Sequence, residues 1–224
     1  MRIPLTPYGR REVILATIVL AVLAAVGALL FWPAALLPAG LWVYVLAFFR
    51  DPSREPEAPE GFLSPADGVV TDVSPVGPDS ALGVAGMRIG VFMSLFNCHV
   101  NRSPCRGTVV RVDRHDGGFV DARRPDASET NESATVLLAC PAGEGTFPVA
   151  IRQVAGLVAR RIVTDVKTGH VLGRGERIGM IKFGSRVELL VPHDRLGEIA
   201  VRVGQKVKAG RTVLAGAGRQ EAAG

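Results

Sequence analysis

Residues 175–192 read GERIGMIKFGSRVELLVP and decide the fold class. Residues 178–182 are mostly apolar and residues 187–191 are rich in Val and Leu, so we expect two short strands. Gly184 lies in the turn between them, where a glycine gives the backbone access to φ/ψ values that other residues avoid. Ser185 follows directly. A lone Gly-Ser pair indicates only a hairpin turn, but a serine in a strained turn can also react with its own backbone.

The 224 residues divide into an uncharged segment and a charged remainder. Residues 13–49 contain no charged side chain, whereas residues 50–224 hold nearly all the charge and have the Gly/Pro spacing of a β-rich domain. The second part is long enough to bury a core of its own. We therefore predict a membrane anchor over residues 1–50, a charged, Pro-rich linker over residues 51–60 and a β-rich domain over residues 61–224.

The predicted anchor has two apolar arms. Residues 13–32 are long enough to span a bilayer as a helix. Residues 34–49 are again apolar, and we expect breaks at Pro33, Pro38 and Gly40. A cleaved signal peptide is disfavoured because the first run exceeds a typical signal core and a second run follows it.

Flanking charge distinguishes a single span from a helical hairpin. A single span would place the domain outside the cell, whereas a hairpin would return it to the side of the N-terminus. Basic residues precede the first arm and follow the second: Arg2, Arg10, Arg11, Arg50 and Arg54. Because positive charge favours the cytoplasmic side, we predict a transmembrane or re-entrant hairpin in the cell membrane, with the domain on the cytoplasmic side.

Composition limits the partners and the compartment. The net charge is +5, and only four of the 26 basic residues are Lys. An Arg excess suits an anionic membrane surface or phosphate head groups, although nucleotide composition explains it equally well. Three cysteines without CxxC spacing indicate neither a disulfide framework nor a zinc site. We expect a reducing compartment, no metal and no nucleic-acid partner.

The remaining pattern predicts a β-rich fold. Asp67-Gly68 forms a turn into a strand, and His99 lies in a loop between two strands. A polar, Gly-rich loop covers residues 113–133. Segments 170–176 and 203–210 look alike, because each is a turn with a basic or Gly-rich bend before a β-branched strand. Flattened β-barrels of the biotinyl/lipoyl type have turns and strands that alternate in this way. Further strands are expected at residues 87–96, 108–112, 134–140, 147–154 and 157–166.

Ser185 allows a specific self-reaction if its turn is strained. The hydroxyl can attack the preceding carbonyl and move the acyl group from nitrogen to oxygen. The resulting ester can eliminate to dehydroalanine, which hydrolyses to a pyruvoyl group and ammonia. Such a serine needs a base and an oriented carboxylate. His99 and Asp67 are residues of these types, although a lone histidine is more often structural.

Four motifs occur in an order that resembles the phosphatidylserine decarboxylase proenzymes of the short type. The resemblance covers about residues 60–192 and fits the N-terminal anchor. The motifs are FLSPADG at 62–68, FNCHVNRSPCRG at 96–107, Asn131-Glu132, and GERIGMIKFGS at 175–185.

The resemblance implies self-cleavage between Gly184 and Ser185. The products would be a β chain, residues 1–184, and an α chain, residues 185–224, which stay together as a heterodimer that can form a higher homo-oligomer. Ser185 would become a covalent pyruvoyl cofactor that withdraws electrons from the serine head group. The expected enzyme is a lyase that converts phosphatidylserine in the membrane to phosphatidylethanolamine.

The same resemblance assigns roles to individual residues. Ser185 matches the pyruvoyl precursor, Asp67 the acid of the Asp-His-Ser processing triad, and His99 a general acid or base of decarboxylation. Arg102 stands where long-type members have a second histidine, the base of the triad, so the base of self-cleavage is open here. Arg186 stands where the family commonly has Thr. We assign Arg186, Arg102 and Asn131 to substrate binding, the alternative for Arg186 being an ordinary strand arginine.

Two other classes fit parts of the pattern. A membrane-anchored biotinyl- or lipoyl-like carrier is suggested by Met180-Ile181-Lys182, but Phe183 stands where such a carrier has a second Met. A serine peptidase would use Ser185, His99 and Asp67 and would remain one uncut chain.

Overall fold

The computed structural model describes residues 4–157 and 161–218. Arg2 and residues 158–160 of the predicted strand 157–166 lie outside the described residues. The chain forms two compact units, Met1–Ser53 and Arg54–Gly224. The division falls inside the segment that we predicted as a linker.

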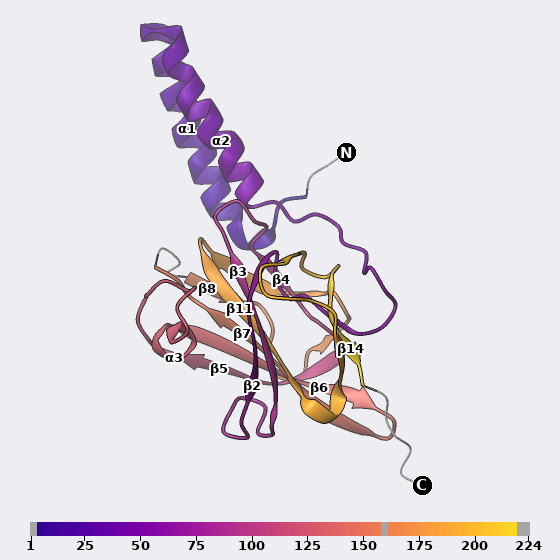
Figure 1. The fold of residues 1–224 in the computed structure, drawn as a ribbon. Coiled ribbons are helices and arrows are strands. Elements are labelled where there is room, and N and C mark those ends of the chain that lie inside the picture. The colour runs from indigo at the N-terminus through magenta and orange to yellow at the C-terminus, as the bar shows by residue number, and fades with distance from the viewer. Residues whose placement is uncertain (1–3, 158–160, 219–224) are drawn as a thin grey trace. The chain divides into compact units, whose positions relative to one another are not determined.

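The first unit is a helical hairpin (Figure 1). The 3₁₀ turn η1 (Pro7–Gly9) leads into α1 (Arg10–Leu30), the 3₁₀ turn η2 (Trp32–Ala35) reverses the chain, and α2 (Leu36–Phe48) returns along α1. The indole N–H of Trp42 on α2 donates to Thr17 Oγ1 on α1 over 3.0 Å. The predicted reversal near Pro33 is therefore confirmed.

The expected break within the second arm is wrong. Helix α2 begins at Leu36 and continues through Pro38 and Gly40. Pro38 lies in the first turn of α2, where backbone N–H groups have no partner inside the helix, so the missing N–H costs no helical hydrogen bond.

Helix α1 fits membrane association by its length and composition. The helical stretch Pro7–Leu30 has 24 residues and is apolar enough to cross a bilayer, whereas the Trp32–Phe48 stretch is shorter.

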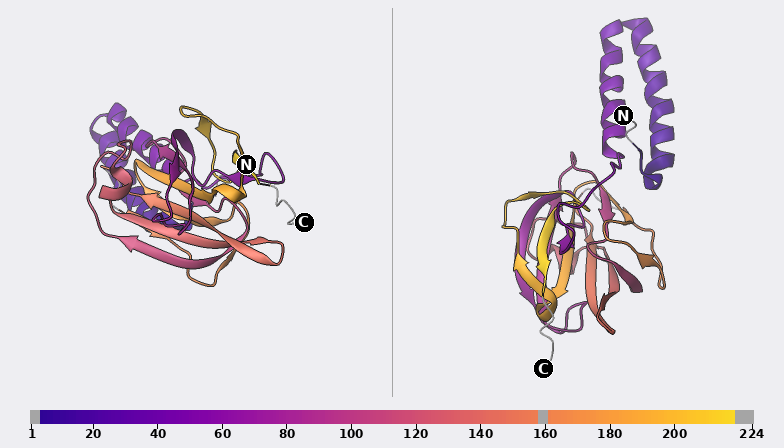
Figure 2. Two further views of the ribbon diagram at one scale, coloured as in Figure 1. Left: turned by 60° about the horizontal axis from the view of Figure 1, so that its bottom comes forward. Right: turned by 90° about the vertical axis from the view of Figure 1, so that its right-hand side faces the viewer.

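The second unit is mostly β, as predicted, with a curled half-barrel sheet at its centre (Figure 2). Eight antiparallel strands follow the order β13-β2-β3-β11-β7-β6-β5-β9. Their bounds are β2 (Gly68–Val76), β3 (Gly86–Met93), β5 (Gly107–His115), β6 (Ser133–Ala142), β7 (Gly145–Val154), β9 (Val171–Leu172), β11 (Ser185–Pro192) and β13 (Lys206–Val207). The strands expected near residues 87, 108, 134 and 147 are thus confirmed.

Two small sheets complete the unit. One has the order β1-β14-β12 and the other β4-β10-β8. The unit also contains two short helices, η3 (His193–Arg195) and α3 (Ala127–Thr130). Helix α3 lies inside the segment predicted as a loop at 113–133. The strands are β1 (Phe62–Leu63), β4 (Val100–Arg102), β8 (Arg161–Thr164), β10 (Arg177–Lys182), β12 (Leu196–Ile199) and β14 (Val213–Ala217).

Strand β11 lies near the middle of the large sheet and is buried along its whole length. Because side chains alternate between the faces of a strand, residues 185, 187, 189 and 191 share one face. Val187, Leu189 and Val191 on this face belong to the main hydrophobic core. The side chain of Ser185 therefore points to the core side of the sheet, at the end where β11 begins.

The two strands around Gly184 are confirmed, but they do not form a hairpin. Strand β10 pairs with β4 and β8, whereas β11 pairs with β3 and β7. Phe183 and Gly184 are thus the crossing from a small sheet to the large one. Both ends of this two-residue crossing are held by neighbouring strands.

Two Ser-Pro turns hold the small sheets to the large one. Residues 64–68 read SPADG and lead into β2, and residues 103–107 read SPCRG and lead into β5. The N–H of Leu63 donates to the carbonyl of Pro104, and the N–H of Arg102 donates to that of Pro65, each over 2.9 Å. The turns therefore lie against each other as a pseudo-symmetric pair.

Candidate functional site

Backbone strain occurs at the crossing between β10 and β11, one residue before the glycine. Phe183 has φ = 76° and is the one non-glycine with positive φ among residues 4–157 and 161–218. Gly184 is not in that region. A bulky residue with positive φ is uncommon and costs on the order of 1–3 kcal/mol. The strain expected in the turn around Gly184 thus lies at Phe183, one residue before the Gly184–Ser185 peptide bond.

Ser185 is completely buried, and its Oγ makes no hydrogen bond to any described residue. In the sheet Ser185 pairs with Met93 of β3. A buried hydroxyl without a partner is unfavourable by about 1–3 kcal/mol. The hydroxyl is therefore not committed to a structural bond and is available for chemistry.

The Gly184 carbonyl lies against Gly156, a residue that the sequence analysis missed. A Cβ on Gly156 would come within 2.2 Å of the Gly184 oxygen, so this approach requires a glycine. Asn131 fixes the neighbouring backbone, because its amide donates to the carbonyls of Ala155 and Val120 over 2.8 Å each. The N–H of Val120 donates back to Asn131 Oδ1, also over 2.8 Å. Asn131 thus holds the wall beside the Gly184 carbonyl.

Asp67 lies at the same end of the large sheet as Ser185. Register connects three adjacent strands there, since Arg186 of β11 pairs with Phe92 of β3, which pairs with Val69 of β2. Two strand spacings amount to about 10 Å. Asp67, two residues before Val69, is thus about two strands from Ser185.

The carboxylate of Asp67 is held at both oxygens. Arg54 Nη2 lies 2.8 Å from Oδ2, and the backbone N–H of Ala209 donates to Oδ1 over 2.8 Å. Asp67 is 7% exposed. No motif in the sequence pointed to Arg54, which lies in the segment predicted as a linker.

His99 is fully buried and lies just before β4. Val100 of β4 pairs with Met180 of β10, so His99 lies toward the end of β10 that leads to Phe183. The other three histidines are exposed. The fold therefore brings Ser185, Asp67 and His99 to one end of the domain.

The three residues assigned to substrate binding have structural partners. Asn131 uses its amide group as described above. Arg102 Nη1 donates to the carbonyl of Gly175 over 3.0 Å. Arg186 Nη2 lies 2.9 Å from Glu188 Oε1 and 3.4 Å from Asp72 Oδ2, on the sheet face opposite to Ser185. Their assignment to substrate stays a prediction.

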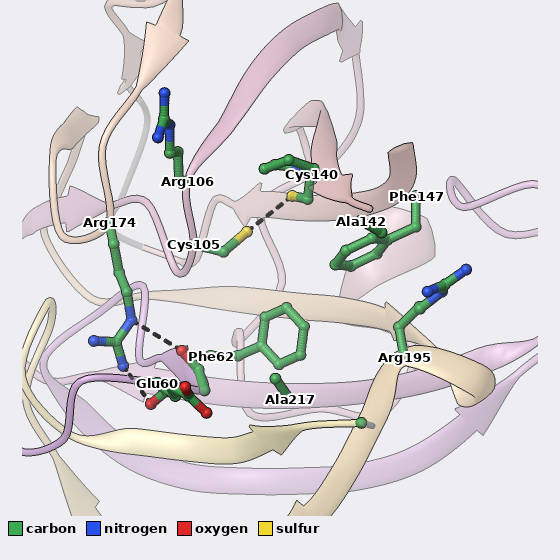
Figure 3. Close-up of a pocket in the computed structure, with 13 residues that line it drawn as sticks. Glu60, Phe62, Cys105, Arg106, Cys140, Ala142, Phe147, Arg174, Arg195 and Ala217 are labelled. Carbon is green, nitrogen blue, oxygen red and sulfur yellow. Dashed lines mark hydrogen bonds between the residues drawn. The ribbon is translucent and has the colours of Figure 1, made fainter. Parts of the chain in front are cut away.

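A cavity of about 350 Å³ lies elsewhere, beside the second Ser-Pro turn (Figure 3). Its wall contains Cys105 and Cys140, whose Sγ atoms are 3.0 Å apart. The hydrogen bond with the Cys140 thiol, together with burial, raises the pKa of the Cys105 thiol well above its usual value. None of Ser185, Asp67 and His99 lines this cavity.

The comparison with known families agrees with the sequence motifs. The family model described as phosphatidylserine decarboxylase matches residues 43–215. The chain belongs to the phosphatidylserine decarboxylase family. Membership of this family confirms the predicted activity, decarboxylation of phosphatidylserine, and the predicted enzyme class.

Curated members of the phosphatidylserine decarboxylase family match over most of this chain. A protein of Rhodopirellula baltica is 43% identical over 214 residues, which cover 95% of this chain and 88% of the relative. One of Ruegeria pomeroyi is 40% identical over 216 residues, 95% of this chain and 94% of the relative. Both are named phosphatidylserine decarboxylase proenzyme. The family is consistent with a pyruvoyl group.

Proposed function

We propose that this chain cuts itself between Gly184 and Ser185 and that the pyruvoyl group of the phosphatidylserine decarboxylase forms from Ser185. The observation that carries the proposal is the buried Ser185 Oγ, which makes no hydrogen bond to a described residue and lies two residues after the strained Phe183. Release of the strain at Phe183 favours a change in the peptide bond that follows Gly184.

The self-reaction balances without an external reagent other than water. Ser185 Oγ loses its proton and bonds to the Gly184 carbonyl carbon, and the Gly184–Ser185 C–N bond breaks to give an ester and a free amine. Loss of the Ser185 α-proton then breaks the Cβ–Oγ bond, and Gly184 leaves as a carboxylate. Water hydrolyses the resulting dehydroalanine and releases ammonia. The pyruvoyl group remains at the start of the 185–224 fragment and supplies an electron sink for loss of CO₂.

His99 and Asp67 have distinct roles in this proposal. His99 is the one buried histidine of the four and acts as the acid and base that moves protons at Ser185 and at the substrate. The Asp67 carboxylate, held by Arg54 and the Ala209 amide, keeps a lone pair on each oxygen to orient a protonated partner.

The cut chain would keep its fold. After cleavage the smaller fragment begins with β11, which has β3 on one side and β7 on the other. Both neighbours belong to the larger fragment, so ladder hydrogen bonds join the fragments along two edges. The product is therefore one α/β heterodimer, on the cytoplasmic side of the cell membrane where the flanking arginines favour it.

Intact mass spectrometry of the purified full chain tests the proposal. We expect two fragments, the smaller one being 185–224 with a blocked N-terminus and lighter by one ammonia than the same fragment with an N-terminal serine. Ser185→Ala should give one uncut chain without decarboxylase activity. Ser103→Ala removes another fully buried serine hydroxyl and should still be cut.

An active chain that remains uncut, with an ordinary Ser185, would refute the proposal. Reaction of Ser185 with a fluorophosphonate probe would favour the peptidase instead. A mass increase on Lys182 by biotin or lipoate would favour the carrier.

A further inference from the structure

The end of the domain that holds Ser185 is formed by three chain connections. Strands β3 and β7 both run antiparallel to β11, so they end where β11 begins. The start of the β3–β4 connection, residues 155–157 after β7 and the Phe183–Gly184 crossing therefore meet around the Gly184–Ser185 bond. The position of Gly156 against the Gly184 carbonyl confirms that the second and third connections touch.

These segments carry large apolar side chains that are partly or mostly exposed. We define the apolar rim as Leu95, Phe96, Leu157 and Phe183, which are 39%, 78%, 65% and 41% exposed. Among the described residues of Arg54–Gly224, every exposed Leu or Phe belongs to this rim. The other exposed large hydrophobic side chains are valines scattered over other loops and strands: Val84, Val110, Val171 and Val203. Exposed apolar side chains of this size, carried by chain segments that meet at one end of the domain, mark an interaction surface.

The segments that carry the rim contain basic residues and no acidic ones. Residues 94–102, 155–163 and 178–187 contain no Asp or Glu. Arg161, which is exposed, opens β8 and pairs in register with Lys182, a buried residue at the end of β10. The nearby carboxylates of Asp121 and Asp126 are already paired with Arg123 and Arg124. An apolar surface with basic flanks matches the interface of a bilayer that contains anionic lipids.

We propose that the apolar rim inserts into the surface of an anionic phospholipid bilayer and brings Ser185 to the level of the lipid head groups. This inference rests on the proposed role of Ser185. A diacyl lipid leaves the bilayer at a large free-energy cost because its chains would be exposed to water. The rim avoids that cost, since the reacting end of the enzyme enters the interface while the acyl chains stay in the hydrocarbon. The rim is thus a second membrane contact, made by residues of the β domain.

The test compares two forms of substrate on the full chain reconstituted in vesicles. One form is long-chain phosphatidylserine in the bilayer, and the other is short-chain phosphatidylserine dissolved as monomers. Phe96→Asp and Leu157→Asp should each lower kcat/KM on the bilayer substrate about tenfold, because each removes a large side chain from the apolar phase and adds a charge. Turnover of the monomeric substrate and the extent of self-cleavage should stay within about twofold of the unmodified chain.

Val171→Asp is the matched control, since Val171 is 65% exposed, as is Leu157, but lies on β9 away from the rim. It should change neither rate. Equal losses on both substrate forms, or an equal effect of Val171→Asp, would overturn the proposal. The competing occupant of the rim is a second copy of the chain, which light scattering in detergent would detect as a dimer. A dimer that Phe96→Asp dissociates would identify the rim as a contact between copies and refute the membrane assignment.

A second readout does not depend on catalysis. The chain has two tryptophans, Trp32 and Trp42, both in the hairpin. Leu157→Trp in a background of Trp32→Phe and Trp42→Phe places one fluorophore on the rim. Brominated phosphatidylserine in the vesicles should quench its emission, and absence of quenching would overturn the proposal. If the emission is quenched but the chain does not cut itself, the rim's membrane contact stands and only the proposed role of Ser185 is refuted.

Discussion

The two Ser-Pro turns share a backbone and differ in what their side chains do. In each turn the serine hydroxyl donates to the carbonyl two residues later over 2.7 Å. The serine carbonyl of each accepts from a glycine with positive φ, Gly210 for the first turn and Gly175 for the second. Each turn also ends in a glycine paired with an edge strand, Gly68 with β13 and Gly107 with β9.

The difference lies in the two residues between proline and glycine. The first turn has Ala66 and Asp67, and its carboxylate is buried and ion-paired with Arg54. The second has Cys105 and Arg106, and the Arg106 side chain is exposed beside the cavity of Figure 3. One scaffold therefore supports two environments, and only the first lies at the end of the sheet where Ser185 begins β11. Position in the fold separates the proposed catalytic turn from the structural one.

The largest expected effect is on the rate of self-cleavage, which should depend on Asp67 of the first turn and not on Arg106 of the second. We expect Asp67→Asn to slow self-cleavage roughly 100-fold or more, because a neutral amide cannot stabilise a protonated partner. Arg106→Gln is the matched change in the second turn and should leave cleavage within about twofold. Denaturing gels over a time course of synthesis measure the uncut fraction. Equal rates for the two variants would remove the functional distinction between the turns.

A smaller effect is expected at the partner of Asp67. Arg54→Gln removes the cation 2.8 Å from Asp67 Oδ2 while the Ala209 amide still holds Oδ1. Self-cleavage should slow about tenfold, as expected when one of two charge-assisted contacts that orient a catalytic group is lost. Arg211→Gln, which breaks the exposed ion pair with Glu57, is the control and should have no effect. An unchanged rate in Arg54→Gln would show that the amide alone positions the carboxylate.

The shared backbone predicts equal structural contributions. Ser64→Ala and Ser103→Ala each remove a buried hydroxyl donor, and each should lower the free energy of unfolding by about 1 kcal/mol. Thermal unfolding in detergent, followed by circular dichroism, measures both. A loss in one variant only would mean that the turns are not equivalent scaffolds.

The smallest effect concerns the thiols of the second turn. Because the pKa of Cys105 is raised, its thiolate fraction at neutral pH is lower than that of an ordinary cysteine. Alkylation by iodoacetamide should therefore be slow at neutral pH and accelerate only at clearly alkaline pH. Cys140→Ser removes the sulfur partner and should speed the reaction at Cys105. Peptide mass spectrometry resolves the sites, and fast alkylation of Cys105 at neutral pH would contradict the assignment. Decarboxylase activity should not change in Cys105→Ser.

Local pattern predicted much of the fold because its signals lie within a few residues. Alternating or β-branched runs between Gly and Pro gave the long strands, and the uncharged run of residues 13–49 gave the hairpin. Pro38 was misjudged because a proline breaks a helix only beyond its first turn, and the start of α2 was not visible in the pattern.

The local sequence pattern could not predict which strands pair when they are distant in the sequence. The turn at Gly184 was interpreted as a hairpin, because adjacent strands usually pair. Instead β10 and β11 join different sheets, and the strain falls on Phe183. Arg54 and Gly156 escaped notice for the same reason, since their contacts are made with residues distant in sequence.

By itself the sequence determined the family, the apolar hairpin, most strands and the order of the motifs that contain Asp67, His99 and Ser185. Each of these depends on residue type and short spacing. Only the tertiary structure decided that Ser185 faces the core side of its sheet, that Arg186 faces the other side among carboxylates, and that Gly156 lies against the Gly184 carbonyl. These facts follow from strand register and sheet order, which depend on how distant segments pack to bury their apolar faces.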